Sequence, residues 1–517
     1  MFRSILTLSF WTMASRLLGF ARDVLIADRL GAGMVADAFF VALKLPDLFR
    51  RLFGEGAFSA AFIPAFAGTL ASEGRDAARR FAEEVASTMV VWLGVLTVAG
   101  VLVMPALMLV LAPGFAEIPA KFALAVRLTR ITFPYLMLIS LTAMFASVLN
   151  GLHRFAAAAA APILFNLSLI AALLFLTPFV PTAGHALAYG VTVSGMGQLV
   201  LVAVAMARAG MVLRLPRPRL TPSVRLLMRR MGPGVIGVGV AQINVAVDTI
   251  VASFLHPGSV SVLYYANRVN QLPLGVIGVA VGTALLPVLS RQVRTRARLQ
   301  AHRTLNRAIE FSLALTLPAA VGLCVVAVPI VRVLFERGAF GGADVAATAA
   351  ALIAYAVGVP GTVLAKVLAP SFFARGDTRT PVAVGVAALA VNLVFIGILI
   401  LPLGPTGIAL AASLSAIFNA AVLAALLVRQ RLFHADRGLR RRVPRMLLAA
   451  VAMGVVLALA VHGIPSGIPS AGGVLRWARL AGIIAAGVLA YGVAGQALAA
   501  FDVREIGRRL GRREGRG

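Results

Sequence analysis

The chain has 517 residues, of which 60% are hydrophobic and only 13% charged, and its mean hydropathy is +0.94. A water-soluble protein of this length could not bury that much apolar side chain, because its surface has to be largely polar. The formal net charge is nevertheless +29, from 48 Lys and Arg against 19 Asp and Glu. The position of these cations therefore decides between a nucleic-acid-binding protein and a membrane protein.

Long apolar segments follow one another along the whole chain. A helix needs about 20 mostly apolar residues to cross the hydrocarbon core of a bilayer. The sequence therefore predicts an all-α polytopic membrane protein with fourteen transmembrane helices, the second of them interrupted by prolines and glycines. In chain order the predicted spans are residues 5–27, 34–66, 88–111, 123–149, 158–177, 186–206, 231–255, 260–289, 308–331, 346–373, 382–401, 406–428, 446–463 and 475–500.

The loops between these spans carry cations on one side only. With the amino terminus in the cytoplasm, the inner segments hold 33 Lys and Arg, against 4 in the outer loops. This positive-inside bias alternates without a reversal, so it predicts that both termini are cytoplasmic. The basic runs at 440–442 and 508–513 contain no interleaved aromatic residues. We expect such loops to contact anionic membrane lipids, and we expect no nucleic-acid partner.

Two halves of the chain resemble each other weakly at an offset of about 224 residues. The segment at 56–64 is echoed at 279–287, the pair at 133–134 at 359–360, and the loop at 150–155 at 374–379. An offset of six spans gives both copies the same orientation, which predicts two six-helix lobes in a pseudo-twofold repeat plus two C-terminal helices. The predicted divisions are an N-lobe at 1–222, a C-lobe at 223–440, helices thirteen and fourteen at 441–500, and a basic cytoplasmic tail at 501–517.

Ionisable residues inside the predicted spans are the candidate functional residues, because each costs several kcal/mol unless it faces a cavity or a partner. In the first span Arg16 and Asp23 lie on nearly one helix face, with Arg22 about 100° away. The second span contributes Asp37 and Lys44 on a shared face. Buried ion pairs that tie helices together are the alternative interpretation of the carboxylates.

The arginines outnumber the acids close to them in sequence. Arg22, Arg50 and Arg268 all fall within or beside predicted spans, as does Arg16. Arginine binds phosphate through two hydrogen bonds and remains charged when it is partly desolvated. A cavity lined by these four residues is expected to accept a phosphate or pyrophosphate anion and to repel cationic drugs.

Evidence for metal ions or cofactors is sparse in the sequence. The six histidines show no metal-ligand spacing, and the single Cys324 permits no intrachain disulfide. Asn244 and Asp248 share a face of the seventh span, where their oxygens are a candidate site for Na⁺ or a proton. An interhelical hydrogen bond is the alternative explanation of this pair.

Several segments resemble one known family, the MurJ (MviN) lipid II flippases of the multidrug/oligosaccharidyl-lipid/polysaccharide exporter superfamily. The similarity extends over essentially the whole chain. The segments that carry it are SRLLGFARD at 15–23, DAFFVALKLP at 37–46, RRLFGEGAFS at 50–59, YYANR at 264–268, QLPLG at 271–275 and RGDTR at 375–379.

The resemblance implies a transporter rather than an enzyme, in the bacterial cytoplasmic (inner) membrane. Such proteins move lipid II, an undecaprenyl-pyrophosphate-linked peptidoglycan precursor, from the inner to the outer leaflet. It places the substrate-binding residues at Arg16, Arg22, Asp23, Asp37, Arg50 and Arg268.

The resemblance also bears on coupling and partners. Some members of the family bind Na⁺, which points here to Asp248 and Asn392, but no carboxylate follows Asn392 within its span. The energy source therefore stays open between Na⁺, H⁺ and the membrane potential alone. We expect no cofactor and no firm metal site, and a functional monomer associated with the machinery of cell-wall synthesis.

Two other transport functions use a similar architecture. A flippase for another lipid-linked oligosaccharide would need the same arginines, since these cannot distinguish sugars. A multidrug cation antiporter would need net acid in its cavity. An enzyme acting on polyprenyl-phosphate donors would need an acid–base cluster, and the sequence shows no convincing one.

Overall fold

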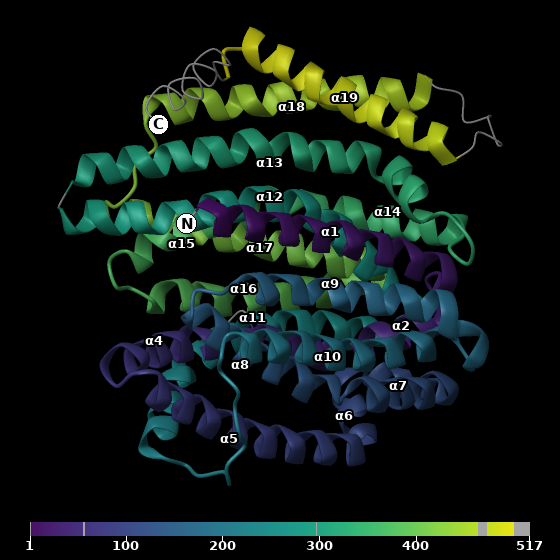
Figure 1. Cartoon of the computed structure of the whole chain (residues 1–517). Coiled ribbons are helices and arrows are strands. Elements are labelled where there is room, and N and C mark those ends of the chain that lie inside the picture. Colours follow the sequence, from purple (N-terminus) through teal and green to yellow (C-terminus); the bar gives the residue numbers. More distant parts are fainter. Residues whose placement is uncertain (1, 55–56, 296, 464–472, 501–517) are drawn as a thin grey trace. The chain divides into compact units, whose positions relative to one another are not determined.

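The computed structural model describes residues 2–54, 57–295, 297–463 and 473–500 (Figure 1). Within these ranges the secondary structure is helical and contains no strand. The predicted basic tail at 501–517 lies outside them. The expectation of an all-α membrane protein is confirmed.

The helices pack into two units. The first comprises residues 1–261 together with 337–341, and the second comprises 262–336 together with 342–517. The helices of the first unit are α1 (Phe2–Leu30), α2 (Met34–Ala42), α3 (Lys44–Gly54), α4 (Ala57–Ser72), α5 (Arg75–Leu102), α6 (Met104–Leu111), α7 (Pro119–Thr132), α8 (Tyr135–Gly151), α9 (Ala156–Ala171), α10 (Ala183–Arg208) and α11 (Pro222–Ser253), with short 3₁₀ or π turns at Pro113–Glu117, Ala172–Leu176 and Thr177–Phe179.

The second unit contains the rest of the helical chain. Its helices are α12 (Ser259–Arg294, with its first turn in the first unit), α13 (Arg298–Phe335), α14 (Gly342–Val357), α15 (Val359–Phe373), α16 (Arg379–Leu403), α17 (Pro405–Arg429), α18 (Arg437–Gly463) and α19 (Gly473–Ala497).

Ten helical segments in the described residues are long and apolar enough to cross a membrane. They coincide with ten of the fourteen predicted spans. The other four predicted spans correspond to α1, α11, α12 and the broken segment at 34–66. Within that segment the helix is broken at Leu43, between α2 and α3, whereas residues 55–56, between α3 and α4, lie outside the described residues. The count of fourteen therefore stays a prediction.

The outward faces of the helices are apolar, as expected for contact with lipid tails. Along α5, Trp92, Val95 and Leu102 are more than half exposed, and Val488 and Val493 are more than half exposed on α19. Apolar side chains exposed to this extent on many helices would be unfavourable in water, but they are favourable in a bilayer. The mean hydropathy thus reflects the outer surface of the helices as well as their core.

Different helix pairs form the core of each unit. In the first unit α1 packs on α9, α2 on α7, and α10 on both α8 and α9. In the second unit α13 packs on α14 and α18, and α18 also packs on α19, as Figure 1 shows. Glycines permit a close approach between α15 and α17: a Cβ atom on Gly361 would lie 2.8 Å from the backbone nitrogen of Ile417.

The units and the predicted lobes differ in the place of α11. This helix packs on α3 and α4 and so belongs to the first unit, whereas the repeat-based division at residue 222 assigns it to the C-lobe. The units follow from packing, but the lobes follow from the internal repeat. The predicted lobes accordingly remain a proposal about the repeat.

Candidate functional site

The charged residues that the sequence singles out in the first unit form three separate clusters. One lies between α1 and α9, one joins α2 to α7 and to the start of α12, and one lies on α3. Each of them combines at least one carboxylate with at least one cation.

The first cluster centres on the Arg22 guanidinium of α1, which is 8% exposed. Its Nη2 and Nε atoms donate to Asp23 Oδ1 at 2.6 and 3.0 Å, and its Nη1 donates to Asn166 Oδ1 at 3.1 Å. Asn166 Nδ2 in turn donates to the carbonyl oxygen of Ser15, at 3.0 Å. The guanidinium also stands over the ring of Phe165, 5.4 Å from its centroid. The α1–α9 contact therefore holds an arginine inside the membrane domain with its charge balanced locally.

The amino-terminal part of α1 differs from this buried end. Arg16, which lies six residues before Arg22, is exposed, as is Thr12. Ser15 is half-buried, whereas Gly19 and Asp23 are buried. The polar face of α1 that carries Arg16 and Asp23 is thus divided into an exposed half and a buried half.

The second cluster surrounds Asp37, whose side chain is fully buried on α2. Its Oδ2 atom accepts from Lys121 Nζ at 2.8 Å and from the Gly258 backbone N–H at 2.7 Å. Its Oδ1 atom accepts from the backbone N–H and the hydroxyl of Ser261, each at 2.8 Å. Four donors from three residues therefore satisfy one carboxylate. We call Asp37, Lys121, Gly258 and Ser261 the Asp37 clamp.

The Asp37 clamp holds the chain at the junction of the two units. Ser261 is the last residue of the first unit before α12 continues in the second. The Asp37 carboxylate accepts from amides in and just before the first turn of α12, where a negative charge is favoured by the helix dipole. Lys121 supplies the neutralising charge and stacks over the ring of Phe115, 4.0 Å from its centroid. The Asp37 clamp thus anchors the first turn of α12 within the first unit.

Sequence reasoning counted Lys121 among the outer-loop cations and so missed its role. The structure places it in the first turn of α7 with only 1% of its surface exposed. Its partner Asp37 lies 84 residues earlier. No periodicity in the sequence connects the two residues.

The third cluster occupies one turn of α3. Asp47 Oδ1 accepts from Arg50 Nε and Nη2 at 3.1 and 2.9 Å, and Asp47 Oδ2 accepts from Arg51 Nε at 2.9 Å. Lys44 lies within electrostatic reach of both Asp47 and Asp248 of α11. Three cations therefore share two carboxylates. Arg50 is 37% exposed through its side chain, so this cluster is accessible as well as positive.

The remaining predicted residues are distributed over both units. Arg268 is half-buried on α12 within the second unit, and Asn392 is fully buried on α16 of the same unit. Asn244 and Asp248 are half-buried on α11 in the first unit. In the described residues, no three His, Cys, Asp or Glu side chains gather in a way that could hold a metal ion.

Comparison with known sequences relates this chain to one family. The family model described as "Lipid II flippase MurJ" matches residues 26–468. A probable lipid II flippase MurJ from Rhizobium meliloti is 44% identical over 497 residues, covering 94% of this chain and 93% of that protein. The lipid II flippase MurJ of Burkholderia cenocepacia is 35% identical over 462 residues, covering 88% of this chain and 89% of that one.

Solved structures agree with the sequence comparisons. The inward closed conformation of a lipid II flippase MurJ aligns over 95% of this chain and 98% of its own, with a TM-score of 0.79 and 26% identity. An inward-facing multidrug resistance transporter of the MATE family aligns over 81% of this chain and 94% of its own, with a TM-score of 0.66. At 14% identity, the second similarity shows the fold alone.

The fold, the apolar outer faces and the buried charged clusters together define a multi-pass membrane transport protein of the MOP-superfamily fold. The extent and identity of the matches then specify the family. The chain belongs to the MurJ family of lipid II flippases, a family of transporters rather than enzymes.

Proposed function

We propose that this protein carries lipid II from the inner to the outer leaflet of the bacterial cytoplasmic membrane. The observation that carries the proposal is the match of the lipid II flippase family model over residues 26–468. The physical chemistry of the membrane domain supports it, because arginine is the side chain best suited to a pyrophosphate in a partly desolvated site.

The substrate-binding residues in this proposal are the arginines of the membrane domain and the acids beside them. Arg22 and Arg50 each have a carboxylate neighbour that orients the guanidinium. The exposed Arg16 and the half-buried Arg268 complete the set. Their positive charge binds the pyrophosphate, whereas Asp23 and Asp37 hold neighbouring groups in place.

Transport follows an alternating-access cycle. The pyrophosphate-sugar head enters from the cytoplasm, and the polyprenyl tail stays in the lipid beside α18 and α19. Rearrangement of the two predicted lobes, 1–222 and 223–440, then exposes the head to the outside. In this topology fourteen spans place both termini in the cytoplasm, and the protein acts as a monomer with anionic lipids around its basic inner loops and the cell-wall synthesis machinery nearby.

The membrane potential is the energy source in this proposal. With the inside negative, it favours outward movement of an anion by about 2.3 kcal/mol per charge at 100 mV. It also favours the inward return of an empty cavity that carries net positive charge. A cation held by Asn244, Asp248 and Asn392, either Na⁺ or H⁺, is the alternative source.

Purified protein in vesicles of defined lipid tests this proposal. Lipid II is placed in the inner leaflet, a potential is imposed with a potassium gradient and valinomycin, and an enzyme added outside detects lipid II that arrives in the outer leaflet. A potential of 100 mV, negative inside, is expected to accelerate arrival by up to about fiftyfold per charge moved.

The outcomes separate the parts of the proposal. Translocation that is indifferent to the potential but depends on Na⁺ or a pH gradient would contradict the energy source alone. Arrival no faster than in protein-free vesicles would contradict the flippase function itself. Equal transport of lipids that carry other oligosaccharides on the same pyrophosphate would replace lipid II specificity by a broader substrate class.

A further inference from the structure

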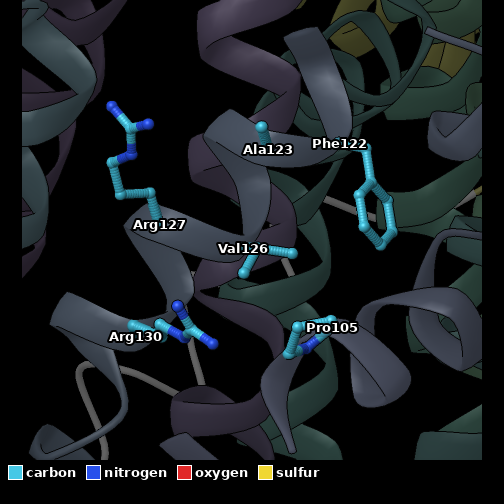
Figure 2. Close-up of a pocket in the computed structure, with 6 residues that line it drawn as sticks. All are labelled: Pro105, Phe122, Ala123, Val126, Arg127 and Arg130. Carbon is cyan, nitrogen blue, oxygen red and sulfur yellow. The ribbon is translucent and has the colours of Figure 1, made fainter. Parts of the chain in front are cut away.

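Two arginines on α7 line a cavity that the proposed transport cycle does not use. The cavity lies between α6 and α7 and has a volume of about 290 Å³. Figure 2 shows Arg127 and Arg130 on successive turns of α7, together with Phe122 of the same helix and Pro105 of α6. The lining is completed by Ala123 and Val126. The walls are otherwise apolar.

Neither arginine is neutralised by an acid. In the part of the chain that the structure describes, no carboxylate lies within ion-pair distance of Arg127 or Arg130, and both side chains are exposed. Arg130 Nε donates to the carbonyl oxygen of Val101 at 3.1 Å, which leaves its two Nη groups for another acceptor. The bond to Val101 satisfies one of the unpaired carbonyls at the end of α5 and fixes the direction of the guanidinium. Two unpaired cations beside apolar walls are costly unless an anion occupies the cavity.

The surroundings of the cavity are those of a lipid-facing surface. Leu102, Val103, Leu109 and Val110 lie on the ends of α5 and on α6, and each is at least half exposed. An acyl or prenyl chain can lie against these side chains while a headgroup reaches the arginines. A ligand without an apolar tail would leave this surface unused.

The positions of Arg127 and Arg130 along α7 indicate which leaflet of the membrane they contact. Arg127 lies eight residues after Pro119, the first residue of α7, which is a rise of about 12 Å. Side chains on a helix lean toward its amino terminus, and Figure 2 shows Arg127 directed that way, whereas Arg130 is held beside Val101 by its hydrogen bond. His185, three residues into α10, lies within electrostatic reach of Arg127, and its buried Nε2 has no hydrogen-bond partner among the described residues. In the proposed topology the first turns of α7 and α10 are both at the outer face.

From these observations we infer that Arg127 and Arg130 bind the phosphate headgroup of an anionic lipid from the outer leaflet. The inference rests on the proposed topology only for the choice of leaflet. A glycerophospholipid with a net negative charge, such as phosphatidylglycerol, fits the two cations, the cavity and the apolar surface beside it. The site is separate from the clusters around Arg22, Asp37 and Asp47.

Lipid binding to the delipidated full-length protein, measured by native mass spectrometry, tests this inference. Phosphatidylglycerol is titrated against the wild type and the double variant Arg127→Gln/Arg130→Gln. Each basic residue near an anionic lipid contributes to the free energy of binding. The loss of two is therefore expected to raise the dissociation constant of the tightest-bound lipid about thirtyfold. Arg127→Lys/Arg130→Lys is expected to retain most of the affinity, since it keeps both charges.

A matched control and two further ligands make the result decisive. Arg332→Gln removes an arginine that is also exposed but is paired with Glu336, so its titration is expected to match the wild type. Inorganic phosphate alone is expected not to compete, and phosphatidylethanolamine is expected to bind more weakly. Equal phosphatidylglycerol binding by the wild type and the double Gln variant would overturn the site, and full competition by inorganic phosphate would overturn its assignment to a lipid. Because binding is measured without transport, failure here leaves the flippase function standing.

Discussion

Arg22→Ala is expected to abolish the translocation of lipid II while the protein still inserts into the membrane. The substitution removes a guanidinium that donates to Asp23 and Asn166, and it leaves the fully buried carboxylate of Asp23 without that cation. Removing one partner of a buried ion pair costs about 3–5 kcal/mol, so stability falls as well. Transport in vesicles and the free energy of unfolding in detergent are both measured.

The double variant Arg22→Ala/Asp23→Asn separates the structural role from the substrate role. It removes both charges, so most of the lost stability is expected to return. Transport is expected to stay absent, because the guanidinium that binds pyrophosphate is still missing. Arg29→Ala, near the carboxyl-terminal end of the same helix, is the control, since its contact with Asp28 at 3.6 Å is partly exposed and contributes little. Recovery of transport in the double variant would contradict a direct role of Arg22 in binding.

Asp37→Ala is expected to be the most destabilising single change in the first unit, by about 3–5 kcal/mol. It removes the acceptor of four hydrogen bonds and leaves Lys121, which is 1% exposed, with its contact to the ring of Phe115 as the one remaining charged interaction among the described residues. The first turn of α12 loses its attachment to α2 at the same time. Thermal unfolding of the purified protein measures the loss, and transport measures its consequence.

Variants of Lys121 give the order of effects that the Asp37 clamp predicts. Lys121→Met is expected to cost less than Asp37→Ala, because the carboxylate keeps its donors from Gly258 and Ser261. Asp37→Asn/Lys121→Met removes both charges and is expected to be more stable than Asp37→Ala. A melting temperature of Asp37→Ala equal to that of the wild type would contradict the clamp.

Residue type and periodicity were sufficient to predict most of the helical architecture. An apolar span and a positive-inside loop are local properties, so ten of the predicted spans appear as helical segments long and apolar enough to cross a membrane. The segment at 34–66 was harder to predict. Its glycines and prolines indicate irregularity, but the break at Leu43 depends on the packing of α2 on α7 and of α3 on α8.

In the candidate site, too, interactions between sequence neighbours could be predicted, whereas interactions between residues far apart in the chain could not. Arg22 and Asp23 are neighbours in sequence. Because ionisable side chains inside a membrane helix are costly in free energy, the sequence alone identifies both as candidate functional residues. Lys121 was missed because its acceptor Asp37 is far away in the chain. Arg127 and Arg130 were counted as span residues but not singled out, because only packing shows that they line one cavity and have no acid partner in the described chain.

The central claim is that this chain moves lipid II between leaflets, and the most direct test is the outer-leaflet content of lipid II in cells depleted of the protein. An externally added probe that modifies only outer-leaflet lipid II is applied in a strain without another flippase. We predict that lipid II accumulates and stays inaccessible to the probe, and that re-expression restores its labelling. Undiminished labelling after depletion would contradict the account.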